Sequence, residues 1–155
     1  PYCIAGRDEN GGWHVIKTAK VTEAVEAAGK VIKVAKNHLF AVGDFVTAGG
    51  KFDGASDKIT IIDKSNAAYD SITLAAAIGA IAKDMVLVTV KAKTDAGSAE
   101  ATVETSEVAI TMAKVDLTVA NQSCGLMVRG TIEERNMPFP LDADLKKLMP
   151  LIRFV

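Results

Sequence analysis

The sequence contains few of the residues from which most enzyme active sites are built. Aromatic residues make up only 5% of the 155 positions, with one tryptophan, Trp13, and there are two histidines, His14 and His38. A Ser-His-Asp or Cys-His site needs a histidine base in a setting that tunes its pKa, and neither histidine has one that can be recognised. Two cysteines, Cys3 and Cys124, are too few for a secreted disulfide framework. We expect free thiols, with pairing of these two left open.

Metal and phosphate motifs are missing as well. The histidines and cysteines do not have zinc-site spacing, and residues 49–51 lack the spacer and the hydroxyl of a phosphate-binding loop. The loop at 53–57 offers too few oxygen ligands for an EF-hand. Carboxylates are paired at 133–134 and at 142 and 144, as in glycosidases, but a polar loop and a helix cap account for them more simply. We therefore expect no enzyme, no cofactor and no metal.

An excess of either charge and a long apolar run are also absent. The 18 basic and 19 acidic residues nearly cancel, which removes the usual electrostatic reason to expect nucleic acid or anionic lipid as a partner. No apolar run reaches the roughly 18 residues of a membrane span. The first residues also lack the basic and apolar regions of a signal peptide. We expect neither nucleic acid nor membrane as a partner.

What the chain does have is a large share of small and β-branched apolar residues. Hydrophobic residues make up 49%, so the core must rely on Ala, Val and Ile. The clearest strands lie at 58–63 and 85–90, where β-branched residues are bounded by Gly, Asp and Ser. The length suits one domain. These features predict a mainly β (α+β) fold, a compact β-barrel or β-sandwich-like domain whose small-residue core gains stability from oligomerisation.

An arrangement of apolar residues recurs 41 positions along the chain. Residues 31–34 match 72–75, residues 40–41 match 81–82, and residues 45–46 match 86–87. The recurrence predicts two similar β units packed together.

Three segments allow more than one interpretation. Residues 21–30 place apolar residues on one helical face and predict a helical turn or two. Residues 70–82 can form a helix, although we favour a short strand followed by a helical turn. Residues 108–119 alternate as a strand, with a change of parity at 113–114 that requires a bulge or a turn between two strands.

The first twenty residues form the least domain-like part of the chain, and residues 21–155 are predicted to be a single β-rich domain. Residues 10–12 are a turn signal between the apolar runs 2–4 and 13–16, which predicts a hairpin. The alternative is an extended arm that is ordered only on a neighbouring protein. Trp13 is either a core residue or an interface anchor.

The last 32 residues predict three elements in a row. Residues 126–132 form a strand interrupted by a glycine, and the two prolines at 138 and 140 impose a rigid extended connector. Asp142 is placed to cap a short helix, which Pro150 ends. The apolar run 151–155 then predicts a final strand that must be covered or paired.

This order resembles the C-terminal part of the lambda-type bacteriophage head decoration proteins, also called capsid cement proteins. The shared features are Leu-Met-Val-Arg-Gly at 126–130, an acidic spacer, Pro-Phe-Pro-Leu-Asp-Ala-Asp at 138–144, a short helix and Ile-Arg-Phe-Val at 152–155. The resemblance covers about a fifth of the chain and includes no catalytic signature. It implies a structural protein of the virion, made in the host cytoplasm, that binds the outer surface of the capsid as a homotrimer.

The partners implied are the major capsid protein and further copies of the chain. From chemistry and position we expect Tyr2, Ile4 and Trp13 to contact the shell. A second set, Arg129, Glu133 and Arg135, is expected to contact neighbouring subunits. The alternative function is a head-fibre base or a ligand-binding or carbohydrate-binding β module. The scarcity of aromatic residues argues against a sugar site.

Overall fold

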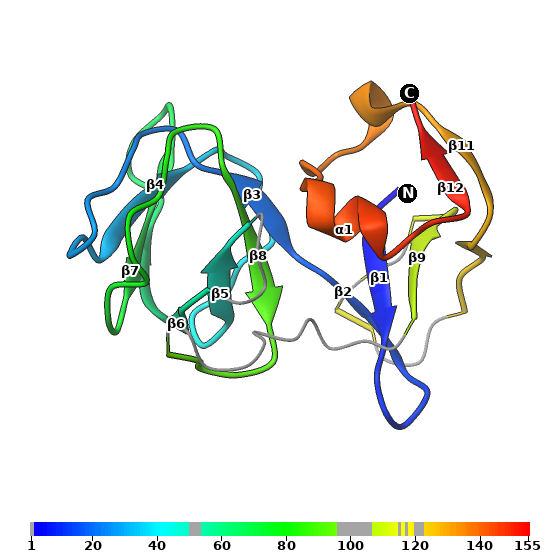
Figure 1. The fold of residues 1–155 in the computed structure, drawn as a ribbon, viewed down its shortest axis with the longest axis horizontal. Coiled ribbons are helices and arrows are strands. Elements are labelled where there is room, and N and C mark those ends of the chain that lie inside the picture. Colours follow the sequence, from blue (N-terminus) through cyan, green and yellow to red (C-terminus); the bar gives the residue numbers. More distant parts are fainter. Residues whose placement is uncertain (1, 50–53, 96–106, 115, 117, 120–122) are drawn as a thin grey trace.

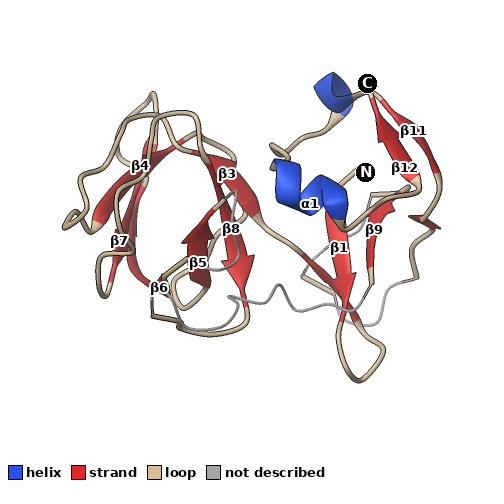
Figure 2. Cartoon of the chain, in the orientation of Figure 1, coloured by secondary structure: helices blue, strands red, loops and turns tan. Residues whose placement is uncertain are grey.

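The computed structural model describes residues 2–49, 54–95, 107–114, 116, 118–119 and 123–155. It is mainly β, with three sheets and one short C-terminal helix, which confirms the predicted fold class. Figures 1 and 2 show two lobes, one formed by β3–β8 and one by both ends of the chain. The strands are β1 (Ile4–Arg7), β2 (Trp13–Val15), β3 (Thr18–Lys20), β4 (Val31–Val34), β5 (Phe45–Ala48), β6 (Ser56–Asp63), β7 (Asp70–Leu74), β8 (Val86–Val90), β9 (Val108–Thr111), β10 (Leu126–Met127), β11 (Gly130–Ile132) and β12 (Ile152–Phe154).

The six-stranded lobe is one curved sheet in the order β3-β8-β5-β6-β7-β4. Its strands alternate as expected for a sheet with one buried face, and in β7 the residues Asp70, Ile72 and Leu74 are buried. The two edge strands approach each other at an isolated bridge between Val21 and Val34. A single bridge does not amount to continuous pairing of the two edge strands, so the strands of the described residues do not close a barrel. Buried Ile, Val, Leu and Phe side chains fill the space inside the curved sheet.

The terminal lobe combines a four-stranded sheet, β10-β9-β1-β2, with the parallel pair β11-β12. A short helix, α1 (Ala143–Lys147), covers them, and Leu145 on this helix is fully buried. The core of this lobe also includes Ile16 and Val88, so β8 contributes to both lobes. Leu87 packs in the six-stranded lobe and Val88 in the terminal lobe, because successive side chains of a strand point to opposite faces.

The predicted internal repeat has a structural counterpart in the six-stranded lobe. Strands β3, β4 and β5 correspond to β6, β7 and β8, and β4 pairs with its equivalent β7 while β5 pairs with its equivalent β8. Four backbone hydrogen bonds recur. The bond from Val21 N to Met85 O (2.8 Å) is equivalent to the bond from Ile59 N to Asp44 O (2.8 Å), and the bond from Asp84 N to Val21 O (2.9 Å) is equivalent to that from Gly43 N to Ile59 O (2.9 Å). The bond from Ala35 N to Lys20 O (2.9 Å) is equivalent to that from Ala75 N to Lys58 O (3.0 Å). The bond from Asp44 N to Ala41 O (3.2 Å) is equivalent to that from Met85 N to Ala82 O (3.3 Å).

The spacing of the repeat is uniform in the prediction but not in the structure. Phe45 corresponds to Val86, as predicted, whereas Ile72 corresponds to Ile32 and not to Val31. The burial of the side chains agrees with this shift, because Ile32 and Ile72 are fully buried while Val31 is exposed. Loops of different length between the equivalent strands account for the difference.

The helical predictions outside the C-terminal region are wrong. Residues 21–30 contain bridges at Val21 and Val25 and a turn, because Val21 pairs with Val34 and Val25 pairs with Ile81. The favoured strand at the start of 70–82 is present as β7, but bends and a bridge follow it in place of the helical turn. In both segments, pairing with a distant strand outweighs local helix propensity. Strand β9 ends at Thr111, before the parity change; Val115 and Leu117 lie outside the described residues.

The C-terminal elements occur in the predicted order, but the single strand predicted at 126–132 is wrong. It is two strands in different sheets, because β10 pairs with β9 and β11 pairs with β12. Strand β11 is followed by a 3-10 turn (Glu134–Asn136), the Pro-Phe-Pro connector, α1 and β12. The Asp142 side chain caps α1 by accepting a hydrogen bond from Asp144 N at 3.2 Å. The connector and helix form the crossover that a parallel pair of strands requires.

Candidate interaction surface

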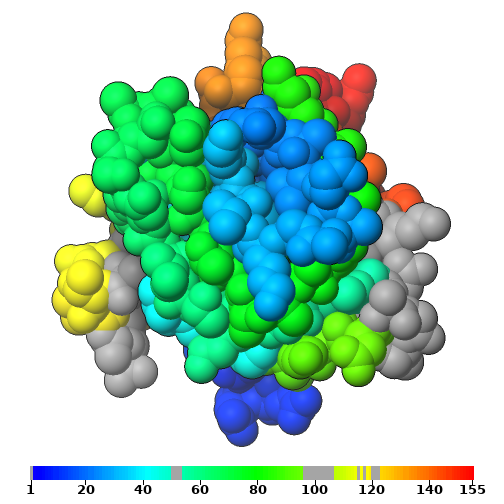
Figure 3. All heavy atoms as spheres, turned by 90° about the vertical axis from the view of Figure 1, so that its left-hand side faces the viewer, coloured from blue at the N-terminus to red at the C-terminus, as the bar shows by residue number. Residues whose placement is uncertain are grey.

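The hairpin of β1 and β2 projects from the terminal lobe. Residues 8–12 extend below the terminal lobe in Figure 1 and below the six-stranded lobe in Figure 3. The two strands pair in antiparallel register, with Arg7 opposite Trp13. Strand β1 also pairs with β9, so the hairpin is continuous with the four-stranded sheet and is not an extended arm.

A single carboxylate holds the tip of this hairpin. Asp8 Oδ1 accepts hydrogen bonds from Asn10 N and Gly12 N, both at 2.8 Å, and Asp8 Oδ2 lies 2.6 Å from His14 Nε2. The hydrogen bond with His14 is the main cause of the lowered pKa of Asp8, and the bond from Gly12 N adds to it. Gly11 has a φ of 82°, which a glycine adopts without strain. The projecting tip is therefore ordered by its own contacts.

Trp13 is the large apolar residue of this hairpin. It is 37% exposed and stands on β2, an edge strand of the four-stranded sheet. Opposite it, Arg7 forms an ion pair with Glu107 at 3.1 Å. A half-exposed tryptophan beside charged groups is a common composition for a protein interface.

The other two residues predicted to contact the shell lie elsewhere. Ile4 is 3% exposed and packs in the core of the terminal lobe, so it cannot contact a partner on the surface of this fold. Tyr2 is half-buried against the same core, and its N donates to Thr111 O. Tyr2 precedes β1, whereas Arg7, the partner of Trp13, is the last residue of β1, so Tyr2 and Trp13 lie toward opposite ends of the strand. The structure therefore does not bring the three residues into one surface.

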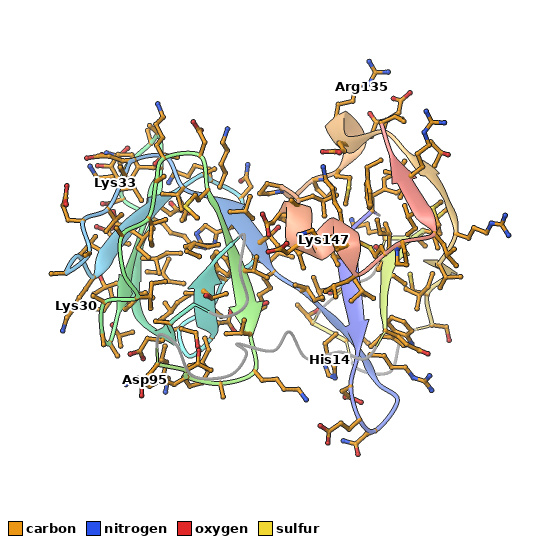
Figure 4. All side chains as sticks on the ribbon, viewed as in Figure 1. His14, Lys30, Lys33, Asp95, Arg135 and Lys147 are labelled. Atoms are coloured by element: carbon orange, nitrogen blue, oxygen red, sulfur yellow. The ribbon has the colours of Figure 1, made fainter. Side chains whose placement is uncertain are left out.

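The residues predicted to contact neighbouring subunits lie at two ends of β11. Arg129 is exposed and directly precedes β11. Glu133 and Arg135 follow β11 and pair with each other, with Arg135 Nη2 2.8 Å from a Glu133 oxygen. Figure 4 shows Arg135 at the end of the terminal lobe opposite His14. Glu133 and Arg135 are thus brought together, whereas Arg129 is separate from them.

Exposed apolar side chains accompany the β11-β12 pair. Val128 and Leu151 lie at its beginning and are 61% and 63% exposed, and Val155 lies at its end. Each of these two strands has a partner on only one side among the described residues. A short parallel pair with open edges and apolar neighbours is a surface on which another chain can pair or pack.

The two histidines have different surroundings. His14 is exposed beside Asp8, whereas the His38 side chain is 1% exposed, and its Nε2 lies 3.1 Å from Asp70 Oδ2 without hydrogen-bond geometry. Phe40 N donates to His38 Nδ1, and Lys36 forms an ion pair with Asp70 at 2.6 Å. Burial is the main cause of the lowered pKa of His38, and Asp70 partly opposes it. This buried cluster is packed between strands and does not line either pocket described below.

A groove of about 320 Å³ lies where the two lobes meet. Its walls are residues 137–141 of the connector, Val86, Glu134 and the ion pair of Lys20 with Asp84, at 2.8 Å. Thr18 Oγ1 donates to Pro140 O at 2.7 Å and ties the connector to the six-stranded lobe. Lys20 and Asp84 pair with each other, and Glu134 pairs with Lys146 outside the groove, so each charged side chain that lines the groove has an ion-pair partner.

Two absences hold for the described part of the chain only. No three or more His, Cys, Asp or Glu side chains come close enough together to hold a metal ion. No helix has the length and apolar character to cross a membrane. Cys3 and Cys124 are both free thiols, and burial raises the pKa of Cys3.

Comparison with protein-family models, with curated proteins and with solved structures found no match to this chain.

Sequence reasoning identified the turn at 10–12 but missed the residue that organises it. An aspartate two residues before Asn-Gly is a signal for a side-chain turn, so Asp8 could have been found. The partnership of Asp8 with His14 depends on the strand register and could not have been read from spacing alone.

Proposed function

We propose that the protein is a structural component of a phage virion that binds the outer surface of the capsid and stabilises the shell. The observation that carries the proposal is the order of elements in residues 124–155, from β10 to β12, on which the resemblance to head decoration proteins rests. The projecting, self-ordered hairpin with Trp13 supports it, because a rigid contact element loses little conformational entropy on docking.

In this proposal the major capsid protein and other copies of the chain are the partners. Trp13 and the hairpin tip contact the shell, and the exposed apolar residues around β11 and β12 contact neighbouring copies in a trimer. Each bound trimer bridges adjacent capsid subunits, so the apolar area it buries must be exposed again before the shell can rupture. No bond is made or broken in this role.

The test is to heat capsids of the phage that encodes the protein, with and without saturating amounts of it. We expect a higher rupture temperature for the decorated shells. Trp13→Ala should weaken capsid binding, since truncating a tryptophan at an interface commonly costs about 2 kcal/mol or more. Ile61→Ala is the matched control, because Ile61 is 58% exposed on the other lobe.

Equal rupture temperatures at full occupancy would refute the stabilising role. Equal loss of binding for the Trp13 and Ile61 variants would refute the hairpin as the contact. Binding to glycans without affinity for capsids would favour the alternative, a carbohydrate-binding or head-fibre module.

A further inference from the structure

A pocket of about 230 Å³ opens on the six-stranded lobe, away from the hairpin and the β11-β12 pair. It is formed by the start of β6, by residues 76–79 after β7 and by residues 93–95 after β8. Figure 4 shows one of its lining residues, Asp95, at the lower edge of this lobe. The walls contributed by Ala55, Ala76, Ala77 and Gly79 are small, and the space beside Gly79 is open. Short side chains leave room for a ligand group of a few heavy atoms.

A buried carboxylate lines this pocket. The Asp57 side chain is only 7% exposed. Its Oδ1 accepts a hydrogen bond from Lys58 N at 2.6 Å. Among the described residues, the charged neighbour of its Oδ2 is Lys93, whose Nζ lies 3.6 Å away, beyond hydrogen-bond distance. Because the Lys93 side chain is 56% exposed, it is free to move toward solvent at little cost.

The internal repeat shows that the fold does not need this carboxylate. In the strand register, Thr18 lies opposite Val88, and Ser56 lies opposite Thr47. Because Val88 and Thr47 are equivalent in the repeat, Thr18 corresponds to Ser56, and the next residue, Ala19, corresponds to Asp57. Ala19 is 2% exposed and packs in the core. Burying a carboxylate costs free energy because the charged group loses its hydration, and an alanine at the same position avoids this cost. The aspartate therefore has a purpose other than closing the sheet.

The buried carboxylate of Asp57 selects the kind of ligand that the pocket can take. Among the described residues that line the pocket, Lys93 is the one cation beside this carboxylate. A calcium ion takes six to eight oxygen ligands, and the pocket has no cluster of three or more candidate ligand side chains in the described chain. An alkylammonium group needs one counter-ion and a small apolar recess for its carbon chain, and the pocket supplies both.

We propose that this pocket binds a primary ammonium group, with Asp57 as its counter-ion and the small residues around it as the recess for the attached carbon chain. The ammonium belongs either to a lysine side chain of a partner protein or to a free alkylamine. Without a ligand, the Lys93 ammonium lies near the Asp57 carboxylate, and the ammonium group of the ligand displaces it. This inference does not depend on the proposed capsid function.

The test is a titration of the isotope-labelled protein with n-butylammonium, followed by the backbone amide NMR signals of Ser56, Ala77 and Thr94. We expect saturable shifts at these signals, and none with n-butanol. Asp57→Asn should weaken binding by about tenfold or more, because the ammonium loses its counter-ion. Lys93→Met should strengthen binding, because a competing cation is removed. Asp63→Asn, an exposed carboxylate on the same strand, is the matched control and should leave binding unchanged.

Replacing the small amine by a lysine-containing peptide distinguishes the two sources. Tighter binding of the peptide than of n-butylammonium, lost when the lysine is acetylated, indicates a partner protein, and equal binding indicates a free amine. Asp57→Ala serves if the asparagine variant does not fold, because alanine already occupies the equivalent position in β3. Absence of saturable shifts, or equal affinity for the wild type and the Asp57 variants, would overturn the proposal.

Discussion

The two halves of the six-stranded lobe have the same backbone arrangement and different side chains. Strands β3–β5 and β6–β8 repeat one set of backbone hydrogen bonds, and each half contributes an isoleucine, Ile32 or Ile72, that is fully buried. Where equivalent positions of the two halves carry the same kind of side chain, the fold requires that side chain. Where they differ, as at Ala19 and Asp57, the fold accepts either residue and the difference needs another explanation.

Equivalent hydroxyl groups show how one arrangement is used in two ways. Ser56 Oγ donates to Ala92 O at 2.8 Å, within the six-stranded lobe. Thr18 Oγ1 donates instead to Pro140 O, in the connector of the terminal lobe. The terminal lobe thus docks at one of two related positions on the repeated sheet.

The largest expected effect comes from breaking the pair at the centre of this repeat. Ile32 and Ile72 face each other in the β4-β7 register, and each is fully buried. Ile32→Ala and Ile72→Ala should each lower the free energy of unfolding by about 2–5 kcal/mol, measured by urea denaturation. If the halves are equivalent, the two losses should be similar. Because the side chains are neighbours, the double variant should lose less than the two single losses combined. A negligible loss for only one of them would contradict the equivalence.

A smaller effect is expected at the turns before β5 and β8. Gly43 and Asp84 are equivalent and both have positive φ, 104° and 69°. Gly43→Ala should cost about 1–2 kcal/mol, because alanine is strained there although no atom blocks its Cβ. Asp84→Gly should change the stability less, since relief of strain is offset by the greater freedom of glycine in the unfolded chain. Equal losses for both variants in urea denaturation would show that the turns are not equivalent.

The smallest effect is a dependence on pH that only one half should show. His38 is buried, whereas residues 75–81, which follow the equivalent strand of the other half, contain no side chain that can titrate. The pKa of His38 is lowered in the folded state, so the unfolded chain binds the proton more readily. The associated stability is fully present above the unfolded pKa of about 6.5 and is lost as the pH falls through that value toward the lower folded pKa.

The measurement is the midpoint of urea denaturation at about pH 7.5 and about pH 5.5, two values above the pH range in which most carboxylates titrate. His38→Gln should reduce the loss of stability between these two values. His14→Gln, at an exposed histidine, is the control. The groups facing His38 are Asp70, Lys36 and Lys64. An unchanged pH dependence in the His38 variant would contradict this prediction.

Local signals in the sequence predicted much of the sheet. The runs of β-branched residues at 58–63 and 85–90 became β6 and β8, and the prolines and Asp142 predicted the order of the C-terminal elements. The prediction failed at 21–30, where Val21 and Val25 pair with Val34 and Ile81. Partners on other strands are a tertiary feature that residue spacing does not reveal.

The candidate sites were harder to predict than the strands. Trp13 was identified by its chemistry, and the structure shows that its side chain is partly exposed on β2. Ile4 has the same apolar character but is buried, because β1 lies between β2 and β9. Asp57 was read as part of a turn, since only the register of β6 with β5 shows that its side chain is buried.

The pairing of β1 with β9 sets an order in which the protein can fold during synthesis. Arg7 and Glu107, which form an ion pair beside these strands, are 100 positions apart in the chain. The strands of the other lobe meet partners nearer in sequence and leave the ribosome earlier, so they can assemble first. Strand β1 must then wait, with one edge unpaired, until translation has passed residue 111 and β9 is available.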